Sequence, residues 1–372
     1  MEFVEGVHLV HAGERVDEVS ALASRLGGTV GLAGVMSDLN RTAVVTTVPG
    51  RAPGWGFKWN AEDNRSQRWF PQGITTSADQ GDPEEIDGRQ VVCTSWYSQD
   101  IGGLDKGARI TFVDITDRSA PRYRHVLLVE PFLTSSGVDV RPVHVHAGGT
   151  VWHGPYLHVA GTAHGLYSFR LDDIVRVPTS GDHSALGLHS SGTSPGAVDS
   201  FGYKYFLPVR FKYDAFADDG FEKMRYSFLS IDRSTSPHHL VAGEYGRRAM
   251  STRLVRYELD PATSLLRTHS DGYARPLELS LGGVQGMQGA TIVKGTYYVT
   301  TSSGRYGYGS LYVGRPGAFT NHAKVLPIGP EDITYWPSRD ELWSLTEYPS
   351  RRYVYAMNRS EYLERSEGTP SG

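Results

Sequence analysis

A unit of two strands recurs along this chain, and each copy begins with a polar residue ahead of a glycine or another small residue. Apolar and β-branched residues then run through a first strand, a tight turn and a second strand rich in aromatic residues. Recognisable copies begin at Gln72, His146, Gln288 and Glu331, and in the last of these Asp332 replaces the glycine. Such repetition over several hundred residues indicates a radial array of β-sheets, most simply a propeller.

The spacing of these units predicts the number of blades. Gln72 and His146 are about half as far apart as His146 and Gln288, so one further unit is expected between the latter two, with its head near Asp199 and Ser200. The last unit has room for about three strands. We therefore expect a strand near the N-terminus to complete it, closing the ring by pairing both ends of the chain.

The sequence thus predicts an all-β protein, a single β-propeller domain over residues 1–372 with a polar tail at 360–372. Five blades are expected, and six is the alternative if residues 29–71 form a blade of their own. A short N-terminal helix is predicted over residues 15–26, because Val16, Val19 and Leu22 recur at helical spacing ahead of two glycines.

Charge and hydropathy exclude several classes of protein. The net charge is −4, and the acidic and basic residues are scattered along the chain without the basic stripe that nucleic-acid binding needs. No run of eighteen apolar residues predicts a membrane span. The first twenty residues lack the apolar segment of a secretion signal, which predicts a cytoplasmic protein as the chain stands, or an extracellular one if a signal peptide has been removed.

Several segments carry a resemblance to a known family. They are residues 69–75 (WFPQGIT), 146–149 (HAGG), 228–235 (FLSIDRST), 329–333 (GPEDI) and 342–347 (LWSLTE). The chain resembles a family of functionally uncharacterised actinobacterial proteins, many of them with secretion signals, that look like β-propellers. The resemblance extends from about residue 55 to residue 357 and implies a propeller fold but no particular activity.

The polar heads of the repeats are the candidate site. In a propeller the first strand of each blade lines the central channel, so equivalent residues converge on one mouth. We interpret His146 as an acid/base catalyst, with Glu331 as its orienting partner. Gln72 and Gln288 are expected to donate hydrogen bonds to a substrate carbonyl. The further substrate-binding candidates are Ser200, Asp332, Trp69 and Tyr97. Alternatively, the heads pair with one another around structural waters.

A metal site is a weaker alternative at the same place. His144 and His146 are two residues apart in an expected strand, so both side chains would point to the same side and could chelate a transition metal with a third ligand. No cofactor is otherwise expected.

The predicted function is that of an enzyme that binds a small organic molecule, such as a specialised metabolite, and promotes its cyclisation, isomerisation or elimination by proton transfer and positioning. A non-catalytic propeller that binds a glycan or small ligand is the alternative. Glycoside hydrolysis would need two convergent carboxylates, for which Glu331, Asp332 and Asp199 are the candidates. A purely structural scaffold is a third possibility.

Overall fold

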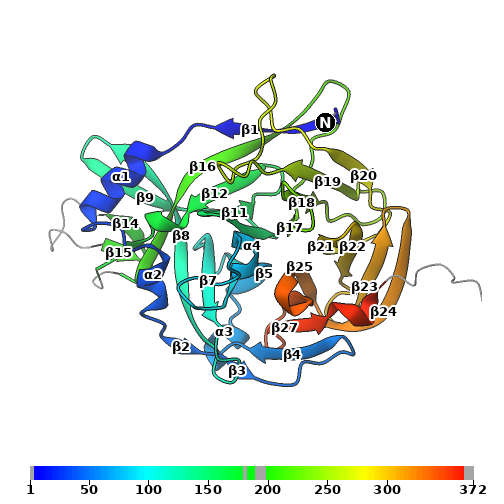
Figure 1. Ribbon diagram of the computed structural model, residues 1–372. Coiled ribbons are helices and arrows are strands. Elements are labelled where there is room, and N and C mark those ends of the chain that lie inside the picture. The colour runs from blue at the N-terminus through cyan, green and yellow to red at the C-terminus, as the bar shows by residue number, and fades with distance from the viewer. Residues whose placement is uncertain (1–3, 179–181, 189–197, 364–372) are drawn as a thin grey trace, which may run out of the picture.

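The computed structural model describes residues 4–178, 182–188 and 198–363, and strands make up about half of this part of the chain and far more of it than helices. The sheets are arranged around a central axis (Figure 1). The predicted all-β class is therefore confirmed. None of the helices in the described ranges is long and apolar enough to cross a membrane.

The largest sheet joins two successive repeat units. The first unit supplies β5 (Trp69–Thr76), β6 (Val91–Ser98), β7 (Ala108–Asp114) and β8 (Arg122–Thr134). The second supplies β10 (Thr150–His153), β11 (Tyr156–Ala160), β12 (Leu166–Arg170) and β16 (Tyr205–Ala217). Neighbouring strands are antiparallel except β16 and β8, which pair in parallel through residues 206–208 and 127–129.

Short strands extend this sheet at its outer side. β1 (Val7–Ala12) and β13 (Val175–Arg176) pair with β16, while β2 (Arg41–Thr42) and β9 (Gly137–Pro142) pair with β8. A separate hairpin consists of β14 (Leu186–Leu188) and β15 (Val198–Ser200).

Three further sheets complete the ring. One contains β17 (Phe228–Asp232), β18 (His239–Gly243), β19 (Arg253–Glu258) and β20 (Glu278–Leu281), and the next contains β21 (Met287–Val293), β22 (Thr296–Thr301), β23 (Tyr308–Arg315) and β24 (Ala318–Ile328). The last sheet has the order β25 (Pro330–Trp336), β26 (Glu341–Thr346), β27 (Tyr353–Asn358), β4 (Pro53–Lys58) and β3 (Val44–Val45). Strands from both ends of the chain therefore share one sheet, through the pairing of β27 with β4.

The helices are short, and α4 (Ser77–Gln80) contacts the inner strands β5, β10 and β25. The predicted N-terminal helix is observed as α1 (Val16–Arg25), which buries Val19 and Leu22 against β8, β9 and β16. The others are α2 (Gly31–Met36) and α3 (Ala61–Arg65), with 3-10 turns at Leu171–Asp173, Pro337–Arg339 and Arg359–Tyr362. This last turn occupies the start of the predicted polar tail, and residues 364–372 lie outside the described ranges.

The innermost strands β5, β10, β17, β21 and β25 contact one another in a closed cycle. Their close approach explains the glycines of the repeat. A Cβ atom added to Gly149 would lie 2.0 Å from the Leu229 nitrogen, and one added to Gly289 would lie 2.6 Å from the Asp332 Cα. Both distances are far below van der Waals contact, so only glycine fits where the strands crowd the axis.

Asp332 occupies the glycine position of the last unit and ties the inner strands together. Its fully buried carboxylate accepts hydrogen bonds from the backbone nitrogens of Ile74 in β5 (3.2 Å) and Thr150 in β10 (3.4 Å). Burial holds the pKa of Asp332 well above its ordinary value. One side chain of β25 thus supplies an acceptor to backbone N–H groups of two neighbouring inner strands, β5 and β10.

A second buried carboxyl group continues this connection. Asp79, in α4, accepts hydrogen bonds from the hydroxyl groups of Thr75 (2.6 Å) and Thr334 (2.8 Å) and from the Thr76 nitrogen (3.0 Å). Burial raises the pKa of Asp79 to about 6. These two aspartates bring β5, β10 and β25 to fixed relative positions at the centre of the ring.

The predicted position of the hidden unit was wrong. Its first strand is β17, and Ser227 precedes that strand, whereas Ser200 ends β15 in the separate hairpin. The strand that follows Ser200 in the chain, β16, completes the preceding unit by pairing with β12. The long β16 and the insertion ahead of it displace the head of the third unit from the regular spacing.

We predict that Asp332→Ala lowers the free energy of unfolding by ~3 kcal/mol or more, because buried backbone N–H groups lose their acceptor and each unpaired group costs about 1–3 kcal/mol. Urea unfolding followed by tryptophan fluorescence measures this. Asp219→Ala, at an exposed loop position, should change stability by less than about 0.5 kcal/mol. Equal stability of the two variants would show that Asp332 does not hold the strands together.

Candidate functional site

A cavity of about 380 Å³ opens where the starts of the inner strands meet. It is lined by Gln72, His146, Gly148, Thr162, Ser227, Tyr245, Gln288, Glu331 and Glu347. Four of these residues are the repeat heads that the sequence identified: Gln72 in β5, His146 ahead of β10, Gln288 in β21 and Glu331 in β25. The head of the third unit that reaches the cavity is Ser227, in the place predicted for Ser200.

Two carboxyl groups form the chemical centre of the cavity. The side chains of Glu331 and Glu347 are hydrogen-bonded to each other, so one of them holds a proton. Burial raises the pKa of Glu331 well above its ordinary value, and the negative charges of Glu347 and Asp332 raise it further. Burial also raises the pKa of Glu347, but hydrogen bonds and the nearby Arg352 oppose that rise. The proton therefore belongs to Glu331.

Both glutamine heads are hydrogen-bonded to this pair. The Gln72 Nε2 donates to Glu347 Oε2 (3.1 Å), and the Gln288 Nε2 donates to Glu331 Oε1 (3.0 Å). The amides are thus oriented with their nitrogens toward the carboxyl groups, which leaves the amide oxygens as acceptors for a ligand. This is the reverse of the prediction that both amides donate to a substrate carbonyl.

His146 stands apart from the carboxyl pair. No hydrogen bond joins it to Glu331 among the described residues, so the predicted role of Glu331 as its orienting partner was wrong. Its ring stacks instead on Tyr97, with the ring centroids 4.4 Å apart. Although His146 is exposed at the cavity wall, the protein atoms around the ring lower its pKa below the ordinary value. The imidazole is consequently neutral near pH 7 and able to accept a proton.

The backbone that carries His146 is held in an unusual conformation. Ala147 has a φ of 53°, a left-handed value that non-glycine residues rarely adopt. Ser95 Oγ donates to the Ala147 carbonyl (2.8 Å) and accepts from the Gly73 nitrogen (3.0 Å), which fixes this turn against β5. A Cβ on Gly148 would lie 2.1 Å from the Ser227 carbonyl oxygen. The residues that follow His146 therefore allow the chain to bend into the crowded centre.

The remaining predicted residues lie at different depths. The Tyr97 ring stacks on His146, which lines the cavity. Burial, followed by the negative charge of Glu347, raises the pKa of Tyr97 to about 12. Asp332 is fully buried beneath the cavity and has a structural role. Trp69 lines a separate pocket and is not among the residues that line this cavity.

The structure does not bring together the two candidate metal ligands. The exposed His144 ring contacts Asp105 through its Nδ1 (3.0 Å), whereas His146 lies at the cavity wall. Among the residues that the structure describes, no group of three or more His, Cys, Asp or Glu side chains is placed to hold a metal ion.

Sequence reasoning missed Glu347, because it considered only the first strand of each unit. Glu347 follows β26, the second strand of its unit, and β26 pairs with β25 so that its end returns to the level of Glu331. A carboxylate directly after that second strand was the available signal. Thr162 and Tyr245, which also line the cavity, come from connecting segments and carried no such signal.

Comparison with known proteins does not place the chain in a family. No family model matches it, and no curated protein matches it. The resemblance to actinobacterial propellers therefore stays a prediction.

Among solved structures, the chain is similar to a GH43_1 enzyme from Xanthomonas citri complexed with xylotriose, with 10% identity over 92% of each chain and a TM-score of 0.35. A gluconolactonase from Xanthomonas campestris has 12% identity over 86% of this chain and 88% of its own, with a TM-score of 0.36. The β-propeller domain of Cps50 (Swd1) from Myceliophteria thermophila has 9% identity over 79% of this chain and 98% of its own, with a TM-score of 0.38. Likenesses this low identify no activity.

We predict that Glu347→Gln lowers the pKa of Glu331, because it removes the neighbouring negative charge, yet leaves it above the ordinary value because burial remains. A pH titration of the side-chain carboxyl carbons by ¹³C NMR measures this, with the Glu331 signal assigned through Glu331→Gln. Glu85→Gln, at an exposed position, serves as the control. An unchanged Glu331 titration in Glu347→Gln would show that the two groups do not share a proton.

Proposed function

We propose that this protein is a five-bladed β-propeller enzyme that binds a small organic molecule in the central cavity and moves protons on it, in a cyclisation, isomerisation or elimination. The closed cycle of five inner strands supports this number of blades. Residues 41–58 support it as well, because their strands join β8 and the last sheet and form no sheet of their own. That observation counts against the alternative of six blades.

The observation that carries the proposal is a proton donor and two proton acceptors around one cavity. Glu331 holds a proton, Glu347 is its ionised partner, and the His146 imidazole is neutral near pH 7. In the proposed reaction His146 removes a proton from the substrate, and Glu331 delivers one to another atom of it. Groups with pKa values shifted in opposite directions by their surroundings are typical of acid/base pairs in enzymes.

The lining of the cavity indicates the charge of the substrate. It contains no Lys or Arg among the described residues, while the carboxyl pair carries about one negative charge. An anionic substrate would be repelled by Glu347 without a compensating cation. We therefore propose an uncharged or amine-bearing substrate, whose polar groups meet the two amide oxygens and the Ser227 hydroxyl.

Glycoside hydrolysis is not favoured by the same pair. Retaining and inverting glycosidases hold their two carboxyl groups about 5–9.5 Å apart so that the sugar or a water fits between them. Glu331 and Glu347 are hydrogen-bonded to each other and leave no such space.

The second candidate is a protein that binds a glycan or other small ligand without changing it. The stacked rings of Tyr97 and His146 favour it, because a flat aromatic face beside polar amides also suits the hydroxyl groups and apolar face of a sugar. Detectable turnover separates the two candidates.

We predict that the protein exchanges a carbon-bound hydrogen of its substrate with solvent. A panel of uncharged carbonyl and hydroxyl compounds, their amine analogues and their carboxylate analogues is incubated in D₂O, and mass spectrometry detects deuterium uptake and rearranged products. His146→Gln and Glu331→Gln should each slow exchange by about 10²–10⁴-fold while ligand binding persists, because an amide keeps a hydrogen bond but does not titrate. His11→Gln, in β1, is the control. Saturable binding with no exchange or product for any compound would favour the binding protein.

We further predict a bell-shaped dependence of the exchange rate on pH. The rate should rise with pH through the His146 pKa, which lies below 6.5, because only the neutral imidazole accepts a proton. It should fall at a higher pH, above the ordinary range of a glutamate, as Glu331 loses its proton. A profile that rises with pH without a later fall would remove Glu331 from the role of proton donor.

A further inference from the structure

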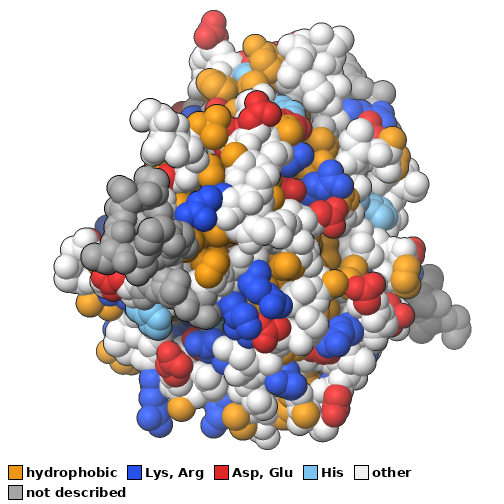
Figure 2. All heavy atoms as spheres, turned by 90° about the vertical axis from the view of Figure 1, so that its left-hand side faces the viewer, with side chains coloured by type: hydrophobic (Ala, Val, Ile, Leu, Met, Phe, Trp, Pro, Cys, Tyr) orange, Lys and Arg blue, Asp and Glu red, His pale blue; other side chains and the backbone are white. Residues whose placement is uncertain are grey.

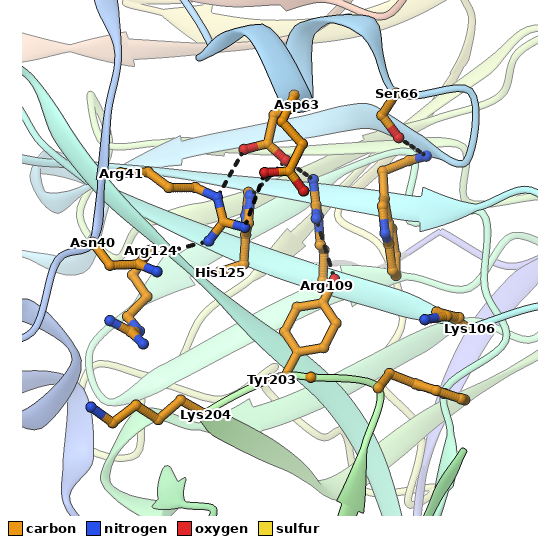
Figure 3. Close-up of a pocket in the computed structure, with 14 residues that line it drawn as sticks. Asn40, Arg41, Asp63, Ser66, Lys106, Arg109, Arg124, His125, Tyr203 and Lys204 are labelled. Carbon is orange, nitrogen blue, oxygen red and sulfur yellow. Dashed lines mark hydrogen bonds and ion pairs between the residues drawn. The ribbon is translucent and has the colours of Figure 1, made fainter. Parts of the chain in front are cut away.

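A second pocket, of about 240 Å³, lies between α3, the strands β7 and β8, and the segment 201–204 (Figure 3). It is lined by five basic side chains: Arg41, Lys106, Arg109, Arg124 and Lys204. Figure 2 shows Lys and Arg side chains gathered on the side of the molecule that carries α1 and α2. The pocket is separate from the central cavity and has no part in the function proposed above.

The carboxylates beside this pocket do not balance its cations. Asp63 pairs with both Arg41 (3.2 Å) and Arg109 (3.0 Å), as Figure 3 shows. Asp38 likewise pairs with both Arg124 (3.3 Å) and Lys204 (2.7 Å). Each carboxylate is thus shared between two cations, which leaves one positive charge in excess at each end of the pocket.

Lys106 adds a third charge in excess. Its Nζ donates to the His183 carbonyl (2.8 Å) and lies 4.8 Å from the centre of the Phe201 ring, so it meets neutral groups. The other acidic side chains nearby are Glu62 and Asp182, both largely in solvent, and Glu62 lies 3.8 Å from Arg41 with its carboxylate 78% exposed. Solvent screens such charges, so they offset little of the excess.

His125 does not contribute to this charge. Burial, followed by the charge of Arg109, lowers the pKa of His125 to about 3, so its ring is neutral. Its Nδ1 contacts the Thr111 hydroxyl (2.6 Å) and its Nε2 lies 3.0 Å from Asp63. Together with the Tyr123 hydroxyl, which donates to Asp63 (2.7 Å), it holds that carboxylate in position toward the two arginines.

Arg109 is built rigidly into the wall of the pocket. Its guanidinium lies between the rings of Trp69 and Trp96, 4.5 Å from each centroid, and its side chain is 4% exposed. Its Nε has no hydrogen-bond partner among the described residues. Its Nη1 donates to the Tyr203 hydroxyl (3.2 Å) and its Nη2 to Asp63 (3.0 Å), so the guanidinium is a fixed positive charge in the wall of the pocket.

We propose that this pocket binds the phosphate group of a small phosphate monoester. Around 240 Å³ the five cations exceed the carboxylates of Asp38 and Asp63 by three charges, or by two when the exposed Glu62 of the lining is counted. Such an excess suits a dianion better than a single carboxylate, and guanidinium groups match the oxygens of phosphate. Phe201, Tyr203 and Trp69 also line the pocket, and they would contact the organic part of the ligand. Phe201 has a φ of 52°, a strained conformation of the kind that persists where a segment contacts a ligand.

Calorimetric titration of the full chain at constant ionic strength tests this proposal, with inorganic phosphate, phenyl phosphate and tricarballylate as probes. We expect saturable binding of phosphate, tighter binding of phenyl phosphate because of the aromatic walls, and weaker binding of the tricarboxylate. The double variant Lys106→Gln/Lys204→Gln should bind phosphate at least ten-fold more weakly. Lys223→Gln/Lys294→Gln, which removes two exposed charges elsewhere, should bind it within about two-fold of the original protein.

Three results would overturn the proposal: no saturable phosphate binding, equal weakening in both double variants, or tricarballylate binding as tight as that of phosphate. Near-ultraviolet circular dichroism establishes that the variants are folded. Should the double variant not fold, Lys106→Gln alone gives the same comparison, because that amine contacts only a carbonyl group and a ring. Since neither variant touches the central cavity, the outcome is independent of hydrogen exchange there.

Discussion

The centre of this fold depends on one buried carboxylate. Where the five first strands approach the axis, their backbones come too close for a side chain at Gly149 and Gly289. The Asp332 carboxyl group accepts hydrogen bonds from backbone N–H groups of two neighbouring inner strands, β5 and β10. Asp332 takes the glycine position of the last unit and links β25 to β5 and β10.

The candidate site follows from the same crowding. The residues at the start of the inner strands lie just before the point where the backbones come too close for side chains. Their polar side chains therefore form a ring next to Asp332. Glu331 precedes Asp332 in the chain and shares its surroundings, and the charge of Asp332 contributes to the raised pKa of Glu331. The group that stabilises the centre thereby also favours the protonated state of the proposed acid.

The repeat in the sequence was sufficient to predict the strand class, the short N-terminal helix and the convergence of Gln72, His146, Gln288 and Glu331. These features depend on a local pattern that each unit contains. Ser200 was misplaced because the insertion ahead of β16 shifts the third unit, and no local pattern marks that shift. The hydrogen bonds around Glu331 and Glu347 could not be predicted either, because they depend on how the second strand of the last unit returns to the cavity.

Arg352 explains why the two carboxyl groups of the site are not equivalent. It is fully buried, and its guanidinium donates to the carbonyl groups of Asp63 (2.7 Å) and Glu347 (2.7 Å) beneath the ring of Phe70. Burial and the nearby Arg109 lower its pKa to about 9, so it is still charged near pH 7. Its charge lowers the pKa of Glu347, while the charge of Asp332 raises that of Glu331. Two acids that would otherwise compete for one proton thus have different surroundings, because Arg352 favours the ionised form of Glu347 whereas burial, the largest cause, favours the protonated form of Glu331. The proton stays on the carboxyl group that Gln288 orients, and the negative charge stays on the one that Gln72 orients.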